Sequence, residues 1–255
     1  MRGFKAFIIK EIKENTRNYR FFILGIVFAV VGLLSPLSAR FLPELLSNMI
    51  DENITIILSD PTYIDSWMQF FSNMNQMALV AFVLVFSSIL SKEYDKGTLV
   101  HMVTKGLPRL TIYYAKFTVM LVSWTFFFWM SFAITLGYTF YYFPEGTTDG
   151  LFLSVGSLYL FGILLIALLM SSAAFFSTVF APLLTVGGFL AVLFILNLFP
   201  FIEEWSPLQL ASRNTELLIR TNADTALNQS LFVSALLILF FLVIGSIKFR
   251  KKALN

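Results

Sequence analysis

The chain has 255 residues, of which 58% are hydrophobic and only 13% are charged, and its formal net charge is +3. An ordinary soluble domain carries about 25% charged residues, so this composition excludes a water-soluble enzyme and is typical of a multi-pass membrane protein. The chain has no cysteine, which excludes disulfides, thiolate metal sites and cysteine nucleophiles.

The N-terminal segment, residues 1–20, has the pattern of an amphipathic helix. Phe4, Ile8 and Ile12 recur at four-residue steps, and the basic residues fall largely on the other faces. A basic residue near anionic lipid contributes about 1 kcal/mol, so we expect an interfacial helix on the cytoplasmic leaflet. A cleaved signal peptide is the weaker alternative, because its charged start would be unusually long.

Long stretches without charged residues predict the membrane spans. Because a helix needs about 20 residues to cross the hydrocarbon core, each of four such stretches fits one span. The stretch 150–202 has 53 residues, about 80 Å as one helix, so we predict that it folds back near residues 177–182, where Pro182 disfavours helix. The result is an all-α, six-span single transmembrane domain with spans at about 21–39, 74–91, 114–143, 151–177, 182–202 and 229–247.

The basic residues predict the orientation of these spans. Fifteen of the 18 Lys and Arg residues lie in the N-terminal arm, in the segment 92–116 and in the C-terminal tail. Eleven of the 15 acidic residues lie in the other connecting segments. Positively charged loops stay inside, so we expect both termini in the cytoplasm.

The uncharged stretches that define the spans hold no ionisable residue, which argues against a proton relay, an ion pathway or an intramembrane enzyme. The sequence also lacks the phosphate-binding loop G-x-x-x-x-G-K-[ST]. We therefore expect no catalytic residue and no bound cofactor in this chain. His101 is the single histidine and has no suitably spaced ligands, so we expect no metal site.

The connecting segment 92–110 carries the most specific signals. Thr98 is a plausible N-cap, Gly106 a C′ glycine, and Pro108 can open the next helix. These signals predict a short helix with Leu99, Met102 and Val103 on one face. It is too short to be stable alone in water and so must pack against something.

The same segment resembles a known family of membrane proteins. Glu93-x-x-x-Gly97-Thr98-Leu99, followed by Pro108-Arg109 and Lys116-Phe117, is similar to the loop between the second and third spans of ABC-2-type permeases. The basic amphipathic start and the six predicted spans extend the resemblance over most of the chain. An ordinary connection between two spans is the alternative interpretation of this short motif.

The resemblance implies a permease subunit of an ABC exporter in a bacterial cell membrane. In that family the loop is a coupling helix that docks on a separate cytoplasmic ATPase, and two permeases, identical or paralogous, pair with two ATPase copies that bind ATP and Mg²⁺. Membrane lipid would be a further partner, and nucleic acid would not. Carried over by position, the expected ATPase-facing residues are Glu93, Asp95, Gly97, Thr98, Leu99, His101, Met102 and Val103. We expect Leu99 and Met102 to govern assembly with the ATPase. We expect Glu93 to affect the coupling of ATP hydrolysis to transport more than the affinity for the ATPase.

The cargo of such an exporter would be a hydrophobic or amphipathic peptide, lipid or drug. Aromatic walls with few charges suit apolar cargo, so Trp124, Phe127 and Phe128 in the third predicted span, with Asn197, are candidates for its path. Helix packing or contact with lipid is the alternative role for these aromatic residues. Gly187 and Gly188 allow close helix approach, as at a seam between two permeases.

A second function class fits the same sequence. A membrane scaffold or sensor could recruit a cytoplasmic partner through segment 92–110 without transporting anything. ATP-dependent cargo movement in proteoliposomes would distinguish the exporter from the scaffold.

Overall fold

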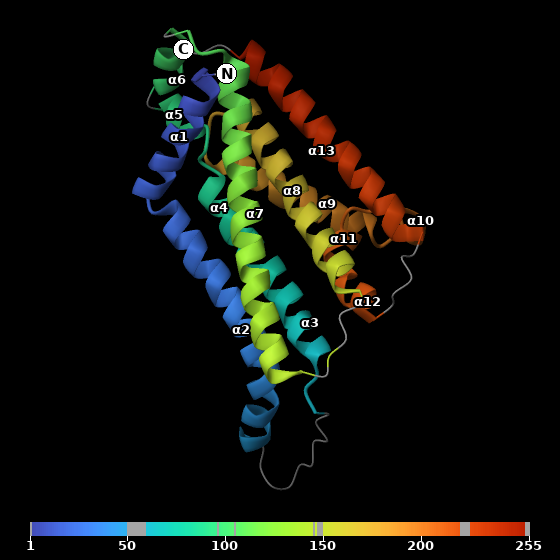
Figure 1. Ribbon diagram of the computed structural model, residues 1–255. Helices are drawn as coiled ribbons and strands as arrows, with labels where there is room; N and C mark the ends of the chain where they lie inside the picture. The colour runs from blue at the N-terminus through green and yellow to red at the C-terminus, as the bar shows by residue number, and fades with distance from the viewer. Residues whose placement is uncertain are drawn as a thin grey trace.

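The computed structural model describes residues 2–49, 60–95, 97–104, 106–144, 146, 150–219 and 225–252. In this part of the chain every regular element is a helix. The elements, labelled in Figure 1, are α1 (Arg2–Arg17), α2 (Arg20–Met49), α3 (Tyr63–Asn73), a π-helical turn (Met74–Ala78), α4 (Leu79–Phe86), α5 (Ser91–Asp95), α6 (Thr98–Thr104), α7 (Arg109–Tyr142), α8 (Leu151–Phe175), α9 (Phe180–Leu196), α10 (Pro200–Glu203), α11 (Gln209–Ser212), α12 (Asn214–Ile219) and α13 (Thr225–Lys251).

Within the described residues, five helical segments are long and apolar enough to cross a membrane. They are Arg20–Glu44, Tyr63–Tyr94, Arg109–Tyr142, Leu151–Phe175 and Leu227–Lys251. A sixth apolar helix, α9, has 17 residues and is shorter than the others. The chain leaves helical geometry between Phe175 and Phe180, at the expected fold-back, and Pro182 lies in the first turn of α9.

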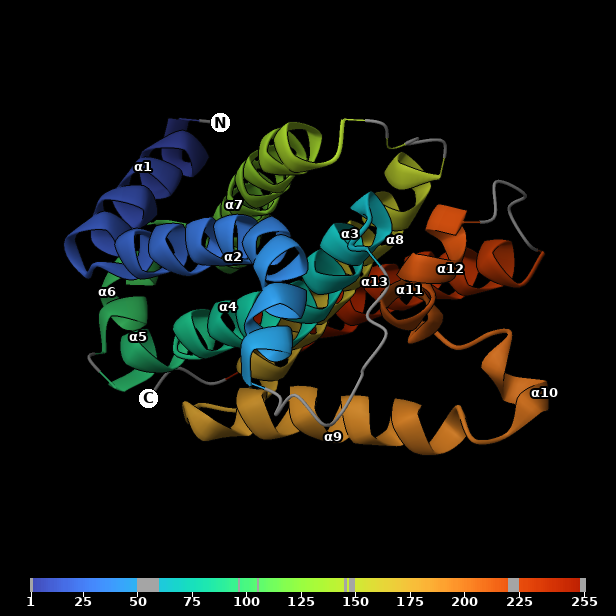
Figure 2. The ribbon, with the colours of Figure 1, turned by 90° about the horizontal axis from the view of Figure 1, so that it is seen from below.

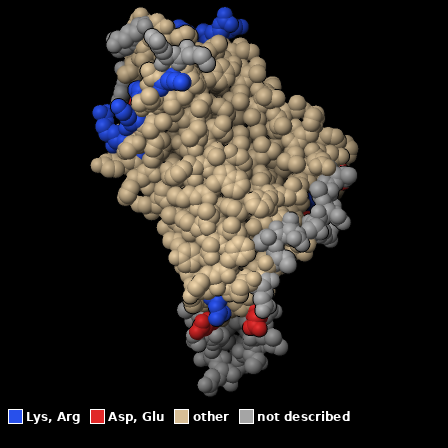
Figure 3. Space-filling view, viewed as in Figure 1, with Lys and Arg blue, Asp and Glu red and all other residues tan. Residues whose placement is uncertain are grey.

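The helix α1, the pair α5–α6 and the end of α13 lie at one end of the bundle, beside the two termini (Figure 1). Most Lys and Arg side chains on the face in Figure 3 gather at this end, and acidic side chains appear toward the opposite end. We call the end that carries the termini the basic end. An asymmetry of this kind is the basis of the orientation predicted from the sequence.

The helix α3 corrects one prediction. The second span was predicted to begin at about residue 74, which left Trp67, Phe70 and Phe71 outside it. Instead α3 continues through the π-helical turn into α4, and these three side chains are buried in the bundle. The Trp67 ring lies 5.5 Å from the ring of Phe132 in α7, so the aromatic cluster joins two helices.

Aromatic side chains also fill the middle of the bundle. Trp124 of α7 packs on Phe28, Phe82 and Tyr159 from three other helices. Its indole lies directly on Gly162 of α8, where an added Cβ would collide with the ring. This glycine therefore sets the close approach of α7 and α8.

After α9 the chain turns back into the bundle. The short helices α11 and α12 pack against α8, and their Leu210 and Leu218 are buried. Asn214 holds the segment, because its amide nitrogen donates to the Ser154 and Leu210 carbonyls and to the Ser157 hydroxyl, each at 2.9 Å. A buried backbone outside long helices needs such partners in lipid.

Candidate functional site

The connector, residues 91–107, consists of the short helices α5 and α6. Gly97 has φ +63° and ends α5, and Gly106 has φ +86° and ends α6. The Gly106 N–H donates to the Val103 carbonyl, and the Leu107 N–H donates to the Met102 carbonyl. This pair of bonds is a Schellman motif, so the C′ glycine predicted from the sequence is confirmed.

Thr98, the predicted N-cap, makes a further contact. Its hydroxyl lies 3.4 Å from the Glu93 carbonyl oxygen at the end of α5 and donates to it. It therefore ties the two helices of the connector together.

The expected partner-facing residues do not share one exposed surface. Leu99 is 1% exposed and belongs to this chain's own hydrophobic core, and Met102 and Val103 are half-buried against the same core. Gly97 and Thr98 are half-buried. The side chains of Asp95 and His101 lie outside the described residues. The expected role of Leu99 in assembly is therefore revised, because in this state its side chain stabilises the connector against the bundle.

Glu93 is also buried, 5% exposed, although an exposed ion pair was expected. Its Oε1 lies 3.0 Å from the Lys10 Nζ and 3.1 Å from the Lys116 Nζ. Lys116 in turn contacts the Glu11 Oε2 at 2.9 Å. Glu93 thus joins α5 to the interfacial helix α1 and to the long helix α7.

Five side chains make up this network, which we call the charge cluster: Lys10, Glu11, Glu14, Glu93 and Lys116. Lys116 lies in the second turn of the apolar helix α7 and is 2% exposed. Its buried charge is compensated by the hydrogen bond to Glu11 and the ion pair with Glu93.

The electrostatic environment shifts two pKa values in α1. Burial disfavours the charged form of Lys10, but hydrogen bonds to Glu11 and Glu14 and the charge of Glu93 outweigh it and raise the pKa. Burial likewise disfavours the Glu14 carboxylate, but its hydrogen bond to Lys10 and the charges of nearby cations lower the pKa. Both groups therefore stay ionised at neutral pH.

The three carboxylates of the charge cluster lie close enough to share a cation, with one oxygen of each within 4.8 Å of the others. Lys10 and Lys116 supply the positive charge there. The Glu93 Oε2 has no hydrogen-bond partner in the described part of the chain.

Two further contacts hold the connector. At one side, Arg20 of α2 donates to the Ser88 hydroxyl just before α5, at 2.7 Å, and to the Asn15 side-chain oxygen. At the other, the Lys252 Nζ donates to the Ala174 and Phe175 carbonyls and lies 4.2 Å from the centre of the Tyr94 ring.

Arg109, at the start of α7, donates to the Lys252 carbonyl at 2.6 Å. Burial and the nearby Lys248 lower the pKa of Lys252. The connector is therefore fixed to both ends of the chain and to the ends of α2, α7 and α8.

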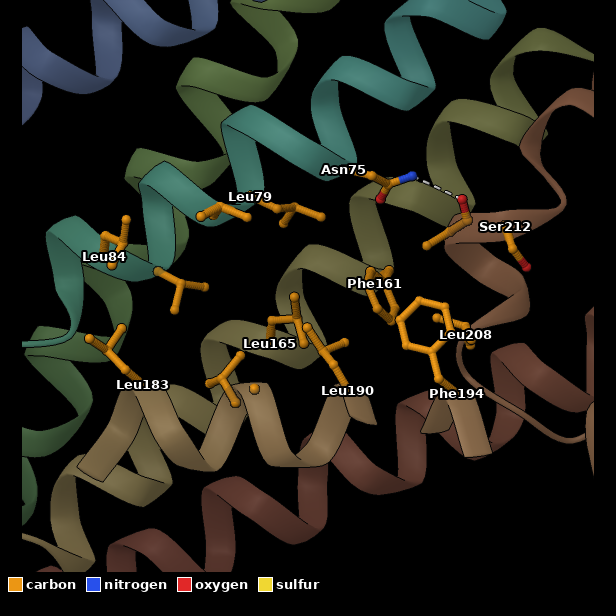
Figure 4. Close-up of a pocket in the computed structure, with 15 residues that line it drawn as sticks. Asn75, Leu79, Leu84, Phe161, Leu165, Leu183, Leu190, Phe194, Leu208 and Ser212 are labelled. Carbon is orange, nitrogen blue, oxygen red and sulfur yellow. Dashed lines mark hydrogen bonds between the residues drawn. The ribbon is translucent and has the colours of Figure 1, made fainter. Parts of the chain in front are cut away.

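A cavity of about 530 Å³ lies between α4, α8, α9 and α11 (Figure 4). Its walls are almost entirely aliphatic and aromatic, with Leu79, Leu165 and Leu190 pointing into it. Asn75 stands at one end, and its amide donates to the Ala211 carbonyl at 3.0 Å. A cavity of this size and lining suits an apolar ligand.

The candidates for a cargo path do not line this cavity. Trp124 and Phe128 are fully buried in the aromatic core, and Phe127 packs on Phe28. Asn197 lies at the C-terminal end of α9. Helix packing therefore uses the aromatic faces of Trp124 and Phe128, and their assignment to a cargo path is not supported, whereas the assignment of Asn197 stays a prediction.

Sequence reasoning missed the charge cluster and the cavity. The charge cluster had a local signal, since Lys10-Glu11 and Lys116 stand out as charges beside apolar runs. The cavity had none, because its lining comes from segments that are distant in the sequence.

No protein-family profile matches the chain. The chain is similar to an uncharacterised transmembrane protein of Bacillus subtilis strain 168, YxlG, with 22% identity over 258 residues that cover 98% of each chain. The apolar helices and this similarity agree on a helical membrane protein.

Proposed function

We propose that this chain is the permease subunit of an ATP-driven ABC exporter in a bacterial cell membrane. In this proposal α9 is the sixth span, both termini are cytoplasmic, and the connector is the coupling element that receives a separate ATPase. Nucleotide and Mg²⁺ bind to that ATPase. The scaffold or sensor function remains the alternative.

The main support for the proposal is that the connector is attached to the helix bundle. A short helical pair at the basic end is fixed by the charge cluster to α1 and α7, so a force applied to it would reach the spans directly. An ordinary flexible loop has no need for buried ion pairs, which cost several kcal/mol in desolvation. The resemblance of the segment from Glu93 to Lys116 to ABC-2-type permeases points the same way.

The apolar cavity supports a hydrophobic or amphipathic cargo. Its wall α9 packs mainly on α8 and lies at the edge of the bundle (Figure 2). Gly187 and Gly188 on this helix have open space around them, which leaves room for a second permease copy or paralogue against α9. Two such subunits and two ATPases would make the complete exporter.

Site-directed crosslinking tests the docking part of the proposal. The chain has no natural cysteine, so single cysteines at Val100 and Thr104 of the connector give crosslinks without background. We expect both to crosslink to the co-expressed ATPase of the same operon. A cysteine at Phe201, which is 86% exposed on α10, is the control and should not crosslink.

Transport in proteoliposomes tests the exporter against the scaffold. We expect ATP-dependent movement of an amphipathic fluorescent peptide or drug, and loss of that movement when Leu190→Trp fills the cavity. Crosslinks from the connector without any cargo movement would favour the scaffold. Connector cysteines that react with a soluble thiol reagent but never reach the ATPase would refute the exporter.

A further inference from the structure

A second apolar cleft opens on the side of the bundle, between α1, the start of α2 and α7. Its volume is about 370 Å³. Ile8 and Ile12 of α1 and Phe21 of α2 line part of it. The remaining lining comes from α7: Thr118, Val119, Val122, Ser123, Phe126 and Phe127. Val122 and Phe126 are 58% and 63% exposed, so the cleft is open to its surroundings.

The lining offers no free polar group. Thr118 donates its hydroxyl to the Tyr114 carbonyl at 2.8 Å, and Ser123 donates to the Val119 carbonyl at 2.6 Å. Both hydroxyls are thus satisfied within α7, and the occupant of the cleft must be hydrocarbon.

The length and direction of the cleft fit one acyl chain. It follows α7 from Thr118 to Phe126, a rise of about 12 Å, starting beside α1 at the basic end. One leaflet of the hydrocarbon core is about 15 Å thick. The cleft is therefore almost as long as one leaflet of the hydrocarbon core is thick.

One exposed cation shares the face of α1 that lines the cleft. Lys5 precedes Ile8 by three residues on α1, so its side chain lies on the same helix face as Ile8 and Ile12. It is exposed and makes no salt bridge to any residue that the structure describes. Lys10, in contrast, is used by the charge cluster.

We infer that this cleft is a binding site for an anionic phospholipid of the leaflet on the side of the termini. One acyl chain occupies the cleft, and the phosphate group lies at Lys5. The site is independent of the proposed transport function, because it needs neither an ATPase nor a cargo.

Native mass spectrometry of the purified full-length chain in detergent tests the site. Phosphatidylglycerol and phosphatidylcholine with identical acyl chains are the probes. We expect phosphatidylglycerol to bind more tightly, and Lys5→Ala to weaken its binding about fivefold, the contribution of one lysine near anionic lipid. The control Lys13→Ala removes another exposed lysine of α1, about two turns further along the helix and not part of the cleft lining, and should weaken it less than twofold.

A cleft-filling variant tests the acyl-chain part separately. Val122→Trp should weaken phosphatidylglycerol binding at least tenfold, because displacing two methylene groups already removes that much. Val192→Trp, the same change at an exposed position of α9, should leave binding unchanged.

Three results would overturn the inference. The first is equal binding of the two lipids, and the second is equal binding by the two tryptophan variants. The third is an efficient disulfide between two copies of a Val122→Cys chain in membranes, which would make the cleft a seam between subunits.

Discussion

Lys116 offers the most direct test of how the connector is held. The change Lys116→Met keeps a long unbranched side chain in α7 but removes the ammonium group that contacts Glu11 at 2.9 Å and Glu93 at 3.1 Å. Both carboxylates are almost fully buried. They would then share only Lys10, whose side chain is 42% exposed.

The expected cost is large because two buried charges lose their central partner. Removing one member of a buried ion pair destabilises a protein by about 3–5 kcal/mol. Removing an exposed surface charge costs less than about 0.5 kcal/mol. Lys13→Met, an exposed change on α1, is therefore the matched control.

Denaturant titration of both variants in detergent micelles measures the free energy of unfolding, and a double-mutant cycle with Glu93→Gln isolates the pair. We expect a coupling energy between 0.5 and about 3 kcal/mol, as for residues in one network. If Lys116→Met had the same free energy of unfolding as Lys13→Met, the charge cluster would not stabilise the connector and this reasoning would fail.

Three further predictions concern other parts of the bundle. Gly162→Ala places a methyl group against the Trp124 indole and should cost about 1–3 kcal/mol in unfolding free energy, whereas Gly156→Ala, with open space around it, should not destabilise the chain. Asn214→Ala removes the buried hydrogen bonds to the Ser154 and Leu210 carbonyls and to the Ser157 hydroxyl and should cost about 1–3 kcal/mol, with faster proteolysis of the segment after α9 as a second readout. Gly106→Ala forces a side chain into the left-handed region and should lower unfolding free energy by about 1–2 kcal/mol, while Gly106→Asn should cost less.

The proposed coupling role of Glu93 makes one further functional prediction. Glu93→Lys places a third cation beside Lys10 and Lys116, so it should uncouple ATP hydrolysis from cargo movement. The assay compares cargo-stimulated ATPase activity of the reconstituted complex with that of the unmodified complex. Unchanged transport and unchanged stimulation would contradict the coupling role.

Local signals in the sequence were sufficient for the helical class, for the long apolar segments and for the end of α6. Each depends on residues that are neighbours in the chain, such as the glycine at 106 with φ +86° or the proline that follows the break before α9. Such signals act through backbone geometry and through transfer of one segment into lipid.

Only the tertiary structure decided which apolar residues face protein and which face lipid. Trp67 in α3 and Phe126 in α7 are both aromatic, yet the first is 1% exposed and the second 63%. In a membrane both environments are apolar, so hydropathy cannot separate them. The pairing of Glu93 with Lys116 and of Lys116 with Glu11 is likewise a property of how α1, α5 and α7 meet. The sequence determined that these charges exist near the basic end, and packing of distant helices determined that they compensate one another.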